Sequence, residues 1–152
     1  MNWVDKKYAK EHNILIGAPE LWQKVQTAIE DAVNSFAQQL DTPDVSSSTE
    51  NGHAIVVKVS FPPEPYPGMP NGIPRVNIVR IIFDDRRNLI TAVLNQKTPA
   101  KFPIEADEKE SFLTYEGERI SPDRLSELAL SDAFYKTPKA ITPAHIRHKQ
   151  IP

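Results

Sequence analysis

The chain has 152 residues, of which 39% are hydrophobic and 25% are charged, and its formal net charge is -2. These values are typical of one globular domain, so we expect a single domain over residues 1–152 and no membrane-spanning segment. A charge this close to zero gives no basic surface for nucleic acid, and the absence of cysteine excludes disulfides and thiol chemistry.

The first predicted element is a long amphipathic helix over residues 21–40. Apolar residues recur there along one stripe at helical spacing, which indicates a helix that covers a core. Pro19 suits the first turn of this helix, and Asp-Thr-Pro at 41–43 ends it. A weaker pattern predicts a short separate helical segment over residues 1–13. This segment lacks the apolar run of a secretory signal, so we expect a cytoplasmic protein.

After a polar loop at residues 41–52, the period of the apolar residues changes from about 3.6 to about 2. This change predicts strands over residues 53–61, 75–83, 89–96 and 110–116. Strands joined by short turns, such as the charged turn at residues 84–87, must run antiparallel. Ser121-Pro122-Asp123 then begins a C-terminal helix, because serine caps free amides and proline suits the first helical position.

The predicted fold is therefore α+β. We expect an antiparallel sheet of four to five strands, with the long N-terminal amphipathic helix packed on one face and the C-terminal helix completing the domain. Apolar residues occupy both faces of the middle strands, and these residues are Val76, Ile78, Ile82, Ile90, Ala92 and Leu94. A second apolar face needs a cover. The sequence leaves four candidates open: the C-terminal helix, the N-terminal segment, a second subunit or a ligand.

The stretch "FPPEPYPGMPNGIPR" holds six prolines between two predicted strands. Proline cannot donate to the hydrogen-bond ladder of a sheet, so we predict a stiff inter-strand loop over residues 62–74 that lies outside the sheet. Each match to a polyproline recognition motif inside it lacks a required residue. The residues we expect at a partner contact are Tyr66 and Met69 of this loop, together with Ile78 and Ile82 of the sheet.

Motifs of catalysis are missing from the sequence. It contains no phosphate-binding loop, no dinucleotide fingerprint and no nucleophile elbow, so it favours a protein that is not an enzyme and uses no cofactor. His145 and His148 lie in a basic C-terminal tail over residues 136–152. Two imidazoles fall short of the three or four ligands that zinc requires, so we predict no metal site.

The function predicted from the sequence is that of a non-catalytic binding or assembly module, and we expect a homodimer that binds neither nucleic acid nor membrane. The alternative is a small-molecule-binding cup or a modest enzyme without a cofactor. A curved sheet under a long helix can enclose such a pocket. The side chains we expect to line it are Arg80, Tyr115 and His53. The sequence names no ligand, partner, pathway or strand order.

Overall fold

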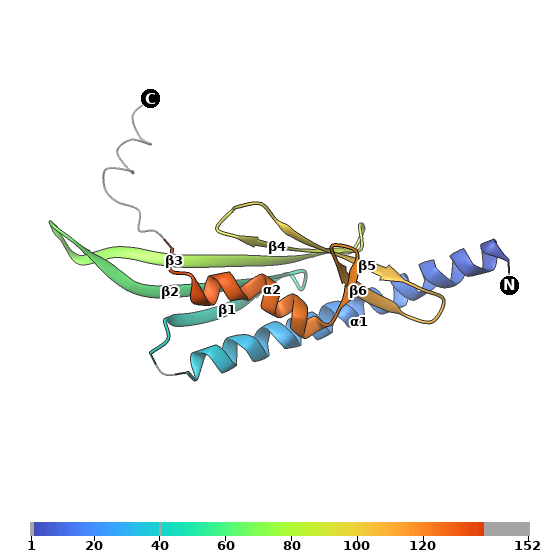
Figure 1. Ribbon diagram of the computed structural model, residues 1–152, viewed down its shortest axis with the longest axis horizontal. Helices are drawn as coiled ribbons and strands as arrows, with labels where there is room; N and C mark the ends of the chain where they lie inside the picture. Colours follow the sequence, from blue (N-terminus) through green and yellow to red (C-terminus); the bar gives the residue numbers. More distant parts are fainter. Residues whose placement is uncertain (1, 40, 139–152) are drawn as a thin grey trace, which may run out of the picture.

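The computed structural model describes residues 2–39 and 41–138. Helix α1 (Trp3–Ala37) precedes seven strands, and helix α2 (Pro122–Tyr135) follows them. The strands are β1 (Asp44–Glu50), β2 (Ala54–Tyr66), β3 (Met69–Asp84), β4 (Leu89–Leu94), β5 (Ala100–Ala106), β6 (Ser111–Tyr115) and β7 (Glu118–Ile120). They form one antiparallel sheet whose spatial order is the order in the chain (Figure 1). The α+β class is confirmed, but the seven strands exceed the four to five expected.

The strands missed by the sequence pattern are β1, β5 and β7. Strand β1 carries serine and threonine in place of alternating apolar residues, and only Val45 of its seven residues is not exposed. It lies at the edge of the sheet, where backbone pairing to β2 holds it without an apolar face. In β5, Pro103 interrupts the strand pattern around Phe102 and Ile104. Strand β7 has only three residues, too few to show a period.

Both helices pack on the same face of the sheet. On β3, Val79, Ile81 and Phe83 are buried, whereas Ile78 and Arg80 between them are exposed. The buried strand residues and the apolar residues of α1 and α2 form one core. Its least exposed members are Phe102, Ile29, Ile55, Ile81, Ile90, Leu113, Leu125, Leu130, Val25, Val57, Val59 and Val79. Helix α2 is therefore not the cover of the opposite face, which we call the second face.

Helix α1 continues through Pro19, so the predicted break between residues 1–13 and a helix beginning near residue 21 is wrong. Asn2 caps the helix, since its Oδ1 accepts a hydrogen bond from the backbone N–H of Asp5 at 3.0 Å. A proline inside a helix removes one backbone hydrogen bond and costs about 3 kcal/mol. Burial of Ala18 and Trp22 beside it offsets that cost, because both pack in the core.

The proline-rich segment 62–74 is not a loop outside the sheet, and that expectation is corrected by the pairing of β2 with β3. Glu64 pairs with Ile73, and Tyr66 pairs with Met69 at the end of the hairpin, with shifts of register between these pairs. We call residues 61–76 the hairpin arm. Neither β1 nor β4 extends along it, so no further strand of the described residues pairs with its outer edges. Proline is tolerated at such edges and at bulges because no ladder donor is needed there.

Helix α1 approaches β6 most closely at Gly17. A Cβ atom on Gly17 would lie 1.8 Å from Oγ and 2.9 Å from Cβ of Ser111. One turn earlier, Nδ2 of Asn13 donates a hydrogen bond to the backbone carbonyl of Asp107 at 3.0 Å. These two contacts fix the point at which the helix leaves the sheet.

Replacing Gly17 by alanine tests this close approach. In an ordinary helix interior the change stabilises by about 0.5–1 kcal/mol. Here we expect a loss of about 1–2 kcal/mol in the free energy of unfolding, because the added methyl group overpacks the contact with Ser111. Denaturant unfolding measures the change. In a Ser111→Gly background, where the obstructing side chain is gone, Gly17→Ala should stabilise instead. A gain in stability in the wild-type background would contradict the contact.

Candidate functional site

The N-terminal end of α1 extends beyond the strands (Figure 1). We call residues 3–16 the projecting segment. Every residue from 3 to 12 is exposed except Ala9, which is half-buried. The first side chain of the helix that packs against the core is that of Ile14. The large apolar side chains of the segment are exposed by the following fractions: Trp3 74%, Val4 52%, Tyr8 68%, Leu15 74% and Ile16 57%.

The projecting segment continues the buried face of the helix. With about 100° per residue, Val4, Tyr8 and Leu15 lie within roughly 40° of one another around the helix axis. The residues on that same side farther along α1 are buried against the sheet, and they are Ala18, Trp22, Val25, Ile29, Val33 and Phe36. The apolar face that builds the core therefore runs on past the edge of the sheet, where no described element covers it.

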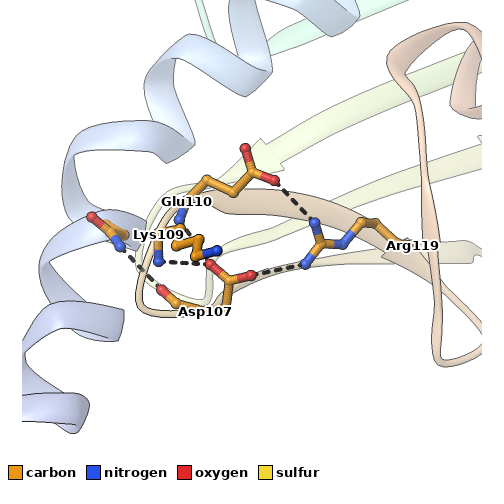
Figure 2. A network of polar contacts seen from close by, with 5 residues as sticks. Asp107, Lys109, Glu110 and Arg119 are labelled. Atoms are coloured by element: carbon orange, nitrogen blue, oxygen red, sulfur yellow. Dashed lines mark hydrogen bonds and ion pairs between the residues drawn. The ribbon is translucent and has the colours of Figure 1, made fainter.

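A polar network stabilises the hairpin between β5 and β6, which contacts the projecting segment (Figure 2). Oδ1 of Asp107 accepts hydrogen bonds from the backbone N–H groups of Lys109 and Glu110, both at 2.8 Å. Arg119 bridges the two carboxylates, with Nη2 3.1 Å from Oδ2 of Asp107 and Nη1 3.0 Å from Oε1 of Glu110. The backbone carbonyl of Asp107 accepts the hydrogen bond from Asn13 of α1. The hairpin between β5 and β6 is thus tied to the base of the projecting segment.

The same contacts act on the acidity of Asp107. The backbone N–H groups of Glu110 and Lys109, followed by the guanidinium group of Arg119, hold the pKa of Asp107 below its ordinary value of 3.8. Each of these donors favours the ionised carboxylate. The turn is therefore most stable with Asp107 charged.

The three side chains predicted to line a ligand pocket lie in three separate places. Arg80 is on the second face, where its Nη2 lies 3.2 Å from Oε1 of Glu50. Tyr115 is on β6, and its ring packs against Phe102 with centroids 5.2 Å apart. Two strands lie between β3 and β6, a separation of about 14 Å at the usual strand spacing. His53 lies in the turn before β2. Within the described residues, Arg80 and His53 line two different hollows.

The four predicted partner residues fall into two groups. Ile78 and Ile82 share the second face, where Ile78 is exposed and Ile82 is half-buried. Tyr66 and Met69 face each other as a pair at the end of the hairpin arm. A hollow of about 680 Å³ lies on the second face, and it is lined by Ile78, Arg80, Val93, Asn95 and Gln96.

Buried polar groups in the described part of the chain are satisfied by the protein itself. Asn77 is 2% exposed, and its Nδ2 donates to the carbonyls of Ala133 and Lys136 at 3.0 and 2.8 Å, which joins the end of α2 to β3. Its Oδ1 accepts a hydrogen bond from Asn95 at 2.8 Å. This buried amide is therefore a structural group that links α2 to the sheet.

Residues 2–39 and 41–138 contain no cluster of three or more His, Cys, Asp or Glu side chains that could hold a metal ion. None of the helices in these ranges is both long and apolar enough to cross a membrane. His145, His148 and the tail from residue 139 onward lie outside the described residues.

Comparison of the chain with models of protein families, with curated proteins and with solved structures gave no match. The surface with the most exposed apolar side chains is the projecting segment, which the sequence reasoning did not select. The signal was present in the spacing of Val4, Tyr8 and Leu15, which continues the later stripe once Pro19 is accepted inside the helix.

The polar network predicts a pH-dependent stability. The folded-state pKa of Asp107 is lowered, so its contribution is complete above the ordinary value of 3.8 and is lost as the pH falls through the folded value. We expect Asp107→Asn to lower the unfolding temperature near pH 6, with the difference from wild type shrinking below about pH 4. Glu108→Gln removes a neighbouring carboxylate as a control. A difference that stays constant with pH would contradict the role of the charge.

Proposed function

We propose that this protein is a non-catalytic binding or assembly module that forms a homodimer, with the projecting segment of α1 as the contact surface. The observation that supports this proposal is the continuation of one apolar helix face from the core into solvent. A helix normally turns such a face toward another part of a protein. In an assembly module, the other part is supplied by a second chain.

The energetics of the segment support a partner. Burying a large aliphatic side chain stabilises by about 1.5–3 kcal/mol, so an exposed set of this kind leaves a substantial driving force unused. Within residues 3–12, the aromatic contact is internal to the helix, between the stacked rings of Tyr8 and His12 at 5.7 Å. Packing against a second surface stabilises both the helix and the assembly.

The other exposed apolar surfaces are smaller. Nine large apolar side chains are exposed among the described residues, and five of them belong to the projecting segment. The second face contributes Ile78, the hairpin arm contributes Tyr66 and Met69, and α2 contributes Tyr135. The second face also carries Arg80 and other charged groups, so it has the mixed character of a sheet face that is in contact with water.

The alternative function is a small-molecule-binding cup. The hollow of about 680 Å³ beside Arg80 is the observation that favours it. Against it, Arg80 already pairs with Glu50, and the other two candidate side chains lie elsewhere. We therefore place assembly first. The compartment we propose is the cytoplasm, which is consistent with a chain that contains no cysteine.

Native mass spectrometry and sedimentation of the purified chain test this proposal. We expect twice the chain mass of 17.1 kDa at micromolar concentration, with no retained small molecule. A mass of one chain would contradict the homodimer. A single chain that carries a defined small mass would favour the cup instead.

A further inference from the structure

The residues of the exposed stripe on the projecting segment have the same sequence of intervals whether they are read from the N-terminal or from the C-terminal end. Its members are Val4, Tyr8, Glu11 and Leu15, separated by four, three and four residues. At about 100° per residue, all four lie within roughly 60° of one another around the axis. A spacing of this kind is the two-residue-per-heptad seam through which helices pair. Its midpoint falls between Ala9 and Lys10.

We infer that two copies of this chain pair through antiparallel projecting segments, with a twofold axis that passes between Ala9 and Lys10. This inference rests on the proposed homodimer and specifies its surface and register. A twofold axis makes each contact occur twice. It places Val4 opposite the second copy's Leu15, and Tyr8 opposite the second copy's Glu11.

Charges on the two flanks of the stripe are complementary in this register. On one flank, Lys7 of each copy lies one residue, about 1.5 Å along the axis, from the level of the second copy's Glu11. On the other flank, Asp5 lies two residues, about 3 Å, from the level of the second copy's His12. Lys6 is directed away from the stripe by roughly 170°, so it takes no part in the contact. Opposite charges at such flanking positions set the partner and the orientation of paired helices.

Polar and apolar groups are also matched at the centre of the pairing. Tyr8 presents a ring for packing and a hydroxyl group that can donate to a carboxylate. The second copy's Glu11 lies opposite it in this register and supplies that acceptor. A carboxylate within an otherwise apolar stripe therefore gains a partner in the dimer. It also disfavours other registers of the stripe, which would place the charge against Val4, Leu15 or the second copy's Glu11.

The stripe supplies exposed apolar side chains to the contact. Val4 exposes 52% of its surface, Tyr8 68% and Leu15 74%. Trp3 and Ile16 lie roughly 110° from the centre of the stripe on opposite sides, so they flank the contact.

The geometry leaves room for both bodies. The overlap runs from Val4 to Leu15 of each copy and is about 17 Å long at 1.5 Å per residue. The hairpin between β5 and β6 contacts α1 at Asn13 and Gly17, which lie roughly 170° and 150° around the helix from the centre of the stripe, so it leaves the stripe open. The two sheets therefore lie at opposite ends of a short helix pair.

Cysteine cross-linking tests the register directly, because the chain contains no cysteine of its own. Separate Val4→Cys and Leu15→Cys chains are mixed at equal concentration and oxidised. We expect a disulfide that joins one chain of each kind. Neither variant alone should cross-link, because the two copies of either position lie about 17 Å apart along the axis, beyond the roughly 7 Å limit for a disulfide.

The outcomes separate this inference from the proposed function. Cross-linking of Val4→Cys with itself would indicate parallel helices and overturn the inference. A wild-type dimer without any cross-link would also overturn it, yet would leave homodimerisation intact with another surface. A monomeric wild-type chain would overturn both. Unchanged thermal unfolding of each variant at low concentration shows that the domain is folded.

Charge exchange gives a second, independent test. Lys7→Glu and Glu11→Lys should each raise the dissociation constant of the dimer by about tenfold, because the symmetry counts each repulsion twice. The double variant should recover most of the loss. Lys6→Glu is the matched control, since it changes the same charge on the opposite side of the helix and should change the dissociation constant less than about twofold. Equal effects of Lys6→Glu and Lys7→Glu in sedimentation would overturn the register.

Discussion

The packing of α1 along one face of the sheet is the interaction on which the rest of the structure depends. A meander of seven strands has no internal crossover to cover it, so one long helix supplies most of the second layer. Trp22 anchors that layer at the edge of the sheet. Its Nε1 donates to the carbonyl of Gly52 at 2.8 Å, and its ring stacks on Phe83 with centroids 5.6 Å apart. Because α1 spans 35 residues and first packs against the core at Ile14, part of its apolar face extends beyond the strands.

Elements governed by local chemistry were predicted well from the sequence. Ser121 begins α2 as expected, since its hydroxyl accepts a hydrogen bond from the backbone N–H of Arg124 at 3.1 Å. The charged turn after β3 is structural, because Oδ1 of Asp84 accepts hydrogen bonds from the backbone N–H groups of Arg86 and Arg87. Elements governed by tertiary packing were not predicted. Pro19 remains inside a helix because of its buried neighbours, and β1 is a strand because β2 lies beside it.

The candidate site shows the same limit in a different form. The pocket prediction selected Arg80, Tyr115 and His53 by residue type. Residue type does not show whether the order of the strands brings the three side chains together. The register of the sheet separates them. The projecting segment was missed for the opposite reason, because its residue types gave no signal and only its position in the fold gives one. Its side chains are ordinary apolar residues at helical spacing, and only the position at which the sheet ends shows that they stay uncovered. A surface of this kind becomes visible once the lengths of helix and sheet are compared.

The hairpin arm carries a consequence for solubility. A two-stranded ribbon that extends beyond its sheet presents two open edges, and unpaired N–H groups along such edges recruit strands from other molecules and promote aggregation. The prolines at positions 62, 63, 65, 67, 70 and 74 lack a backbone N–H group, which reduces the number of donors along both strands of the arm. The composition that first resembled a recognition motif therefore lowers the capacity of the arm to pair with strands of other molecules.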